Sequence, residues 1–154
     1  MKLSACYIVK DEVEELHRSL LSLRAAVDEI IIVSTAGDAL VPAVAETFDA
    51  QCYEYAWQND FSRARNYALE RATGDVVIFL DADEYFFYPE TVRECIEELV
   101  YAHPNFDIIM IPLCNFMTKG SLRDARMIQS PRIFCREGLH YVGVVHEQLM
   151  RDDD

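Results

Sequence analysis

Short, uninterrupted apolar runs alternate with amphipathic segments through most of the chain, and this order constrains the fold more than any other feature. Continuous apolar runs are typical of strands buried on both faces, whereas a 3.6-residue periodicity is typical of helices. The expected strands are residues 3–9, 30–33, 51–55, 76–80 and 107–113, and the expected helices are 11–23, 42–48, 61–71 and 89–102. This alternation predicts an α/β fold, Rossmann-like, with an open, mostly parallel sheet flanked by helices.

Right-handed crossovers bring the carboxyl ends of such strands to one edge of the sheet, where ligands bind. The segments to inspect are therefore 10–12, 34–38, 56–60 and 81–84. Later in the chain only short strands are expected, at 131–135 and 141–145. With no internal repeat and no low-complexity linker, residues 1–154 are expected to form a single domain.

Composition excludes several classes of protein. The net charge of −13 disfavours a nucleic-acid partner, because phosphate backbones require basic surfaces. The chain has no uncharged apolar stretch of about 18 residues, so no transmembrane segment is predicted. Its first residues lack the long apolar segment and small-residue cleavage site typical of a signal peptide. Five scattered cysteines without a CxxC pair indicate reduced core thiols, so we expect a cytoplasmic location. An acidic protein can still bind a nucleotide diphosphate through a divalent cation.

Three carboxylates follow the most apolar run directly: Asp81, Asp83 and Glu84. Carboxylates this close repel one another unless cations lie among them, and Mg²⁺ typically takes one or two carboxylates plus phosphate oxygens. Along an extended segment, Asp81 and Asp83 would point to the same side. The alternative is structural, with Asp81 and Glu84 capping a helix or lying in a solvated turn.

Three segments occur together in a characteristic order and spacing: Ile-Val-Lys-Asp-Glu at 8–12, Trp-Gln-Asn-Asp-Phe-Ser-Arg-Ala-Arg-Asn-Tyr-Ala-Leu at 57–69, and Leu-Asp-Ala-Asp-Glu at 80–84. Over residues 3–148 the chain resembles family 2 glycosyltransferases of the GT-A fold, in particular those of bacterial lipopolysaccharide-core and cell-wall biogenesis. The resemblance implies an inverting, metal-dependent glycosyltransferase of class EC 2.4. Such relatives usually continue well past 154 residues, so we expect a catalytic domain without their C-terminal acceptor-side part.

The resemblance implies a nucleotide-sugar donor, UDP-linked, and a glycan, lipid-linked or protein acceptor in cell-envelope biogenesis, at the inner face of the membrane. The residues implied in donor binding are Tyr7, Val9, Glu12, Ser34, Asp38, Trp57, Arg65, Asn66 and Asp81. Two of them have a structural alternative. Arg65 would otherwise be a surface residue paired with Glu70 or Asp60, and Trp57 would pack beneath its loop.

For catalysis, the resemblance implies a divalent cation, Mg²⁺ or Mn²⁺, held directly by Asp83 with Asp81 and His146 as further ligands. Glu147 would be the general base that deprotonates the acceptor hydroxyl, which requires a carboxylate within hydrogen-bond reach. The alternative makes Glu147 a residue that only orients an arginine such as Arg132. The oligomeric state has no signal in the sequence.

The chain departs from the family pattern after the second strand, where DTGSTD becomes Ser-Thr-Ala-Gly-Asp-Ala at 34–39. Ser34 replaces an aspartate that contacts the base in relatives, a loss of about 1–3 kcal/mol in recognition, although Asp38 lies one position early. A second hypothesis is therefore a degenerate nucleotide-binding or interaction domain without transferase activity. A nucleotidyltransferase is disfavoured, because residues 10–13 contain no glycine to cradle a triphosphate.

Overall fold

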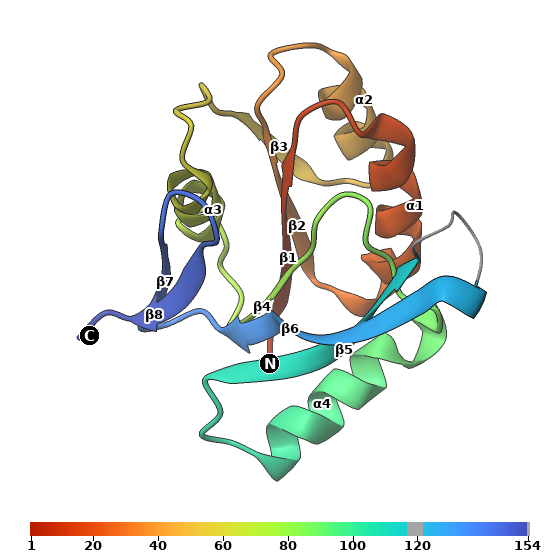
Figure 1. The fold of residues 1–154 in the computed structure, drawn as a ribbon, viewed down its shortest axis with the longest axis vertical. Coiled ribbons are helices and arrows are strands. Elements are labelled where there is room, and N and C mark those ends of the chain that lie inside the picture. The colour runs from red at the N-terminus through yellow and green to blue at the C-terminus, as the bar shows by residue number, and fades with distance from the viewer. Residues whose placement is uncertain (117–121, 154) are drawn as a thin grey trace.

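A six-stranded mixed sheet forms the centre of the computed structural model, which describes residues 1–116 and 122–153 (Figure 1). Its strand order is β3-β2-β1-β4-β6-β5. The strands of this sheet are β1 (Leu3–Val9), β2 (Glu29–Ser34), β3 (Gln51–Glu54), β4 (Val76–Phe79), β5 (Ile108–Phe116) and β6 (Ala125–Cys135). Strands β1 to β4 pair in parallel, which confirms the predicted α/β, Rossmann-like fold.

Helices cover both faces of the sheet because its central strands are apolar on both sides. The α-helices are α1 (Val13–Leu23), α2 (Leu40–Thr47), α3 (Phe61–Leu69) and α4 (Val92–Ala102), and the 3₁₀ helices are η1 (Arg24–Ala26), η2 (Pro89–Thr91) and η3 (Leu122–Asp124). One hydrophobic core joins α1, α2 and α4 to the sheet, and the other joins α3. No helix in the described ranges is long and apolar enough to cross a membrane.

The C-terminal third differs most from expectation. Strand β6 is longer than the predicted 131–135 and runs antiparallel to both β4 and β5. Beyond it, β7 (Leu139–Val142) pairs only with β8 (Gln148–Arg151), a strand that the sequence pattern did not predict. These two strands form a separate hairpin that packs beside α3 (Figure 1). Its apolar positions are too few to give a periodic signal.

Side chains fix the ends of two helices near the carboxyl edge. The Asp60 side chain accepts a hydrogen bond from the Arg63 backbone N–H at 3.1 Å, so Asp60 caps α3. Helix α1 begins at Val13, two residues later than predicted, because the Glu12 carboxylate accepts from the backbone N–H groups of Lys10 and Asp11. The turn at residues 10–12 thereby faces the carboxyl edge of the sheet.

At the opposite, amino-terminal edge of the sheet, Glu29 joins the starts of three strands. Its carboxylate accepts hydrogen bonds from Ser4 Oγ (2.5 Å), the Thr73 backbone N–H (2.5 Å) and Thr73 Oγ1 (2.8 Å). Burial alone would raise the pKa of Glu29, but these hydrogen bonds outweigh it and lower the pKa. Gly74 lies beside this cluster, and its backbone N–H donates to Ser4 Oγ at 2.8 Å.

Candidate active site

A cleft of about 500 Å³ opens at the carboxyl edge of the sheet, where the sequence pattern predicted a ligand site. It lies among the ends of β1 and β4, the N-terminal turn of α3 and the loop between β7 and β8. The lining residues are Ile8, Glu12, Glu15, Phe61, Arg65, Asp81, Ala82, Asp83, Val145, His146 and Glu147. Five of these are carboxylates and one is an arginine, so the cleft is strongly acidic.

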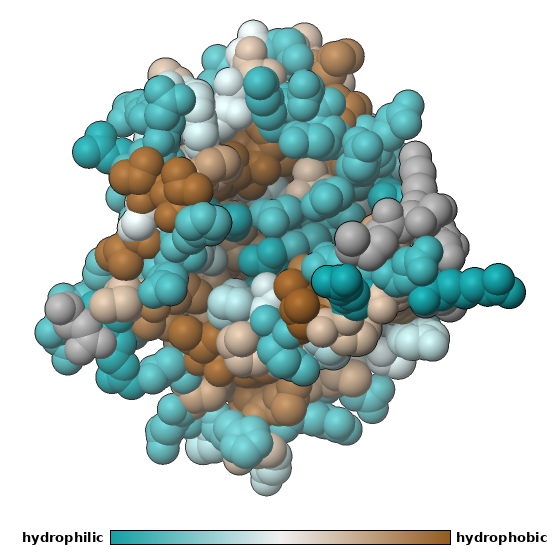
Figure 2. All heavy atoms as spheres, in the orientation of Figure 1, coloured by the Kyte–Doolittle hydropathy of each residue, from teal (hydrophilic) through white to brown (hydrophobic). Residues whose placement is uncertain are grey.

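Six of the predicted site residues meet in this cleft: Glu12, Arg65, Asp81, Asp83, His146 and Glu147. They come from positions far apart in the sequence, and the topology of the sheet brings them together. Figure 2 shows hydrophilic side chains across the middle of the drawn face, with hydrophobic ones at its left, in the region of α3. The cleft also includes Glu15 and Phe61, which the sequence motifs did not single out.

Five charged side chains form one continuous chain of alternating sign, here called the charge chain: Glu147, Arg65, Asp81, Arg132 and Glu84. Arg65 Nε donates to Glu147 Oε1 at 2.6 Å, and Arg65 Nη2 donates to Asp81 Oδ1 at 3.0 Å. On the other side, Arg132 Nη2 donates to Asp81 Oδ2 at 3.2 Å, and Arg132 Nε donates to Glu84 Oε2 at 2.9 Å. Both oxygens of Asp81 are thus bound by guanidinium groups.

Arg65 links Glu147 to Asp81 in the charge chain and is only 7% exposed. Its Cζ lies 4.7 Å from the ring centroid of Phe79 and 5.4 Å from that of Tyr141, an arrangement in which aromatic faces stabilise a cation. Burial alone would lower the pKa of Arg65, but Asp81, Tyr141 and Glu147 outweigh it and raise the pKa. The alternative pairing with Glu70 or Asp60 is therefore wrong, because the side chain points inward.

Arg65 Nη1 is buried and has no hydrogen-bond partner among the described residues. Leaving such a donor unsatisfied costs about 1–3 kcal/mol. The protein thus keeps an incompletely paired guanidinium in the wall of the cleft.

Arg132 holds the turn after β4. It is the main partner of Glu84, whose side chain is 10% exposed. Burial raises the pKa of Glu84, the hydrogen bonds from Arg132 oppose this, and the nearby Asp81 adds to the rise. The sequence did not predict this pairing, because Arg132 reaches the site from the antiparallel strand β6. The antiparallel pairing of β6 with β4 brings Arg132 beside the turn after β4, and a prediction of that pairing would have found the contact.

We had expected Asp81 and Asp83 to lie on an extended segment, but they do not. Residues 82 and 83 form a turn, because the Glu84 backbone N–H donates to the carbonyl of Asp81 at 3.0 Å. The two carboxylates therefore differ in environment. The Asp81 side chain is 46% exposed and paired on both oxygens, whereas Asp83 is exposed and has no ion pair or side-chain hydrogen bond within the described ranges.

The predicted residues of strand β1 have their side chains in the core. Tyr7 is fully buried and its hydroxyl lies 2.7 Å from Ser19 Oγ, while Val9 is 1% exposed. Ile8 points to the opposite face and lines the cleft. Side chains alternate along a strand, so this strand offers the cleft Ile8 and its terminal backbone groups rather than the side chains of Tyr7 and Val9.

Strand β2 ends in a buried polar side chain, and the loop that follows it is not buried. Ser34 is 1% exposed, and its Oγ has no partner among the described residues. Asp38 is exposed and its Oδ1 accepts from the Leu40 backbone N–H at 3.0 Å, so it stabilises the start of α2. Gly37 has a φ of +71°, which favours glycine in this turn. Neither Ser34 nor Asp38 lines the cleft.

Trp57 and Asn66 also lie outside the cleft lining. Trp57 is 39% exposed; its ring contacts that of Phe61 edge-on at 4.8 Å between centroids, and its Nε1 donates to Asn59 Oδ1 at 3.1 Å. Trp57 thus supports the rim through Phe61. The amide of Asn66 contacts the backbone of Tyr141 rather than the cleft.

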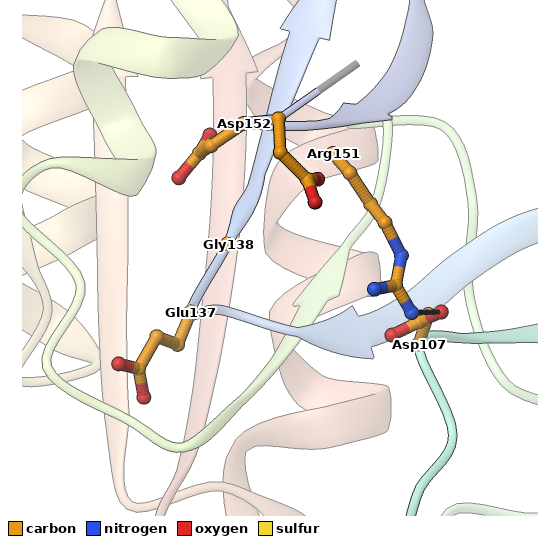
Figure 3. A pocket seen from close by; sticks show the side chains of 6 residues that line it. Asp107, Glu137, Gly138, Arg151 and Asp152 are labelled. Atoms are coloured by element: carbon orange, nitrogen blue, oxygen red, sulfur yellow. Dashed lines mark hydrogen bonds and ion pairs between the residues drawn. The ribbon is translucent and has the colours of Figure 1, made fainter.

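A smaller pocket of about 240 Å³ lies elsewhere on the molecule, lined by Asp107, Glu137, Gly138, Arg151, Asp152 and Asp153. Figure 3 shows Arg151 reaching Asp107, with which it forms an ion pair, while Glu137 points away from that pair. None of the three characteristic sequence segments contributes to this pocket. The larger cleft is therefore the candidate active site.

Comparison with known proteins identifies the family of the chain. The sequence profile of glycosyl transferase family 2 matches residues 4–142. The chain belongs to this family. Among curated relatives, a TPR repeat-containing protein of Synechococcus elongatus is 45% identical over 83 residues, covering 54% of this chain and 21% of that protein. The prophage-derived glycosyltransferase SunS of Bacillus subtilis is 29% identical over 146 residues, covering 93% of this chain and 33% of SunS.

Solved glycosyltransferase structures share the fold of this family 2 domain. TarS 1–349 of S. aureus in complex with UDP superposes with a TM-score of 0.67 at 18% identity, covering 88% of this chain and 47% of that one. Glucosyl-3-phosphoglycerate synthase of Mycobacterium tuberculosis, in complex with Mn²⁺ and UDP-glucose, gives 0.54 at 18% identity, covering 66% and 40%. These similarities confirm the predicted GT-A fold. The chain spans less than half the length of each of these relatives.

Proposed function

We propose that this family 2 domain is a metal-dependent, inverting glycosyltransferase that transfers a sugar from a UDP-linked donor to a hydroxyl acceptor. One observation carries the proposal: an acidic cleft at the carboxyl edge of the sheet contains two carboxylates, Asp83, which has no ion pair among the described residues, and Glu147. Asp83 is suited to bind a divalent cation, and Glu147 is suited to accept the proton of the acceptor hydroxyl.

The acidity of the cleft argues for the cation. Glu12, Glu15, Asp81, Asp83 and Glu147 line it, and among the described residues Arg65 is the only arginine or lysine of the lining. A nucleotide diphosphate would be repelled from such a surface unless a cation accompanied it. The Mn²⁺ and UDP-glucose bound together in the mycobacterial relative support the same requirement.

The donor atoms fit Mg²⁺ or Mn²⁺ that binds together with substrate. In the described part of the chain, no group of three or more His, Cys, Asp or Glu side chains converges on one point. Magnesium commonly takes only one or two carboxylates and completes its shell with phosphate oxygens and water. Asp83 would hold the ion, with Asp81 and His146 nearest to assist. A cation held there would supply positive charge to neutralise the charge that develops on the leaving diphosphate.

The chain's own side chains would then direct the transfer. Arg65 lines the cleft, and its positive charge there favours the anionic donor. Glu147 has Oε1 bound to Arg65, which leaves Oε2 to take the proton of the acceptor hydroxyl. The acceptor oxygen forms a bond to the anomeric carbon as the bond from that carbon to the diphosphate breaks. Attack from the face opposite the leaving group inverts the anomeric centre.

For the acceptor, we propose a hydroxyl group of a cell-envelope glycan, in line with the resemblance to lipopolysaccharide-core and cell-wall enzymes. Phe61 (41% exposed) and Val145 (61% exposed) form an apolar margin of the cleft near Glu147. An apolar margin of this kind suits the less polar face of a sugar ring.

Ser34 and Asp38 favour a second candidate, a domain that binds nucleotide without transferring sugar. Neither residue lines the cleft, so the position that reads the base in relatives offers no carboxylate here. Calorimetry of UDP with and without Mn²⁺, followed by assays of UDP release, separates the two candidates. Binding without turnover of any donor would establish the second.

The experiment that tests the proposed function is Asp83→Asn, assayed by UDP release from UDP-glucose and UDP-N-acetylglucosamine with Mn²⁺ or Mg²⁺. Loss of a residue that stabilises developing charge lowers turnover by about 10²-fold or more, so we expect that loss together with loss of metal-dependent UDP binding. Thermal stability should not fall, because the exposed Asp83 has no partner to lose in the described structure.

Asp49→Asn is the matched control. Asp49 is exposed, lies outside the cleft and has a φ of 54°, which asparagine adopts readily. It removes the same charge and should leave both measurements unchanged. If Asp83→Asn instead retained metal-dependent UDP binding, the assignment of the cation to Asp83 would be wrong.

A further inference from the structure

The β7–β8 hairpin carries Glu147 but is not part of the main sheet. Its two strands pair only with each other. Glu147 immediately precedes β8, at the end of a loop in which Gly143 and His146 have positive φ angles of 101° and 61°. Such a loop does not fix the place of Glu147 by itself. Contacts to the rest of the domain must do so.

Helix α3 supplies those contacts. The Asn66 Nδ2 donates to the carbonyl of Tyr141 at 2.9 Å, and the Tyr141 backbone N–H donates to Asn66 Oδ1 at 2.8 Å. One side-chain amide thereby satisfies both backbone groups of a β7 residue, as a neighbouring strand would. One helical turn earlier along the chain, the Phe61 backbone N–H donates to the carbonyl of Val144 at 3.1 Å.

The ring of Tyr141 reinforces this attachment. It is 6% exposed and packs edge-on against Phe79 and Phe134, at 5.5 and 5.9 Å between centroids. The backbone bond to Asn66 and the aromatic contacts together fix β7 on the face of the sheet that α3 covers. Six residues along the chain, Glu147 then lies within 2.6 Å of Arg65, the neighbour of Asn66.

We propose that Asn66 is a positioning residue: it seats β7 through its paired amide bonds and thereby sets Glu147 against Arg65 in the cleft. This role replaces the donor contact implied by sequence resemblance. The geometry supports the replacement, because Asn66 does not line the cleft and both ends of its amide are engaged by backbone. The kinetic part of the proposal rests on the proposed function of Glu147.

The decisive variant is Asn66→Asp, which keeps the acceptor for the Tyr141 N–H and removes the donor to its carbonyl. The first measurement is amide hydrogen exchange, which needs no substrate. We expect faster exchange at Tyr141 and through residues 139–147, with the central strand β1 unchanged. Asn105→Asp, at an exposed position outside the cleft, adds the same charge and should alter neither region. Unchanged exchange in residues 139–147 would overturn the seating role.

The second measurement is a double-mutant cycle on UDP-glucose and UDP-N-acetylglucosamine hydrolysis with Mn²⁺, where water is the acceptor. Asn66→Asp alone should lower kcat about tenfold or more, with KM and UDP affinity unchanged. In a Glu147→Gln background it should have little further effect, because residues that act as a unit are not additive. If the two substitutions lowered kcat additively, or if Asn66→Asp weakened UDP binding, the claim that Asn66 acts through Glu147 would be wrong.

Failure of this proposal is distinguishable from failure of the proposed function. If the unmodified chain binds no UDP with Mn²⁺ and releases none from any donor, the proposed function fails, while hydrogen exchange still decides whether Asn66 seats β7. Should Asn66→Asp reduce folding broadly, Asn66→Ser removes the acceptor and the donor without adding charge. The same local pattern of exchange is expected for it.

Discussion

Two glutamates at opposite edges of the sheet have nearly equal burial and opposite electrostatics. The side chain of Glu29, at the amino-terminal edge, is 9% exposed, and that of Glu84, at the carboxyl edge, is 10% exposed. Hydrogen bonds from the neutral groups of Ser4 and Thr73, with an ion pair from Lys2, lower the pKa of Glu29 despite burial. Burial and the nearby Asp81 raise the pKa of Glu84 in spite of Arg132. Two glutamates with the same burial can therefore have pKa values shifted in opposite directions.

The difference shows how the domain divides stability from binding. At the amino-terminal edge every carboxylate oxygen of Glu29 accepts hydrogen bonds from groups fixed by three strands. At the carboxyl edge, like charges are crowded and Asp83 has no partner within the described residues. A carboxylate satisfied by the protein stabilises the fold, and one left unsatisfied is available to a ligand.

Arg65→Met gives the largest expected loss of stability, because it breaks the charge chain. Removing one partner of a buried ion pair typically costs about 3–5 kcal/mol, and Arg65 serves both Asp81 and Glu147. We expect a fall of that size in the free energy of unfolding, measured by urea denaturation. Arg63→Met on the same helix is the control: its side chain is 67% exposed and should cost less than about 1 kcal/mol. Equal losses would refute a central role for Arg65.

Gly74→Ala tests the amino-terminal edge. An added Cβ would lie 2.4 Å from Ser4 Oγ, 2.8 Å from Ser4 N and 2.9 Å from the carbonyl of Lys2. Two of these are backbone atoms, so β1 or the turn before β4 must shift, at a cost of about 1–3 kcal/mol. Differential scanning calorimetry should show the lower stability, while calorimetric UDP binding with Mn²⁺ is retained. Loss of UDP binding without loss of stability would contradict the division between the two edges.

Glu29→Gln has the smallest expected effect and a defined dependence on pH. Because the folded pKa of Glu29 lies below its ordinary value of about 4.3, its stabilisation is present above that value and is lost as pH falls through the folded pKa. The variant should be less stable than the original chain by about 1 kcal/mol at pH 7. Denaturation from pH 7 to pH 3 should show this gap closing. If the difference in stability between the two chains instead increased as the pH fell, the folded pKa of Glu29 would not be lowered.

Much of the fold was predictable, because each central strand is a local apolar run and each covering helix has its own periodicity. The position of Asp81 and Asp83 at the carboxyl edge was also predictable, since parallel strands share that edge. The antiparallel β6 and the β7–β8 hairpin were not. Their pairing depends on partners far along the chain, and their exposed faces weaken the apolar pattern.

Side-chain partners were the least predictable part of the site. Arg65 and Glu147 are 82 residues apart in sequence, and no local pattern relates them. Strand β1 is apolar on both faces, so its sequence does not distinguish the buried side chains of Tyr7 and Val9 from that of Ile8, which lines the cleft. Only the packed structure shows which side each residue of β1 faces.

The independence of the β7–β8 hairpin has an evolutionary consequence. A unit that pairs only with itself and is attached to α3 through a small number of contacts can be exchanged without rebuilding the six-stranded sheet. The carboxylate proposed to accept a proton travels with this unit, whereas Asp83 stays with the sheet. Acceptor chemistry and donor chemistry can then diverge at separate rates, and hairpin chimeras between family members offer a direct route to recombining them.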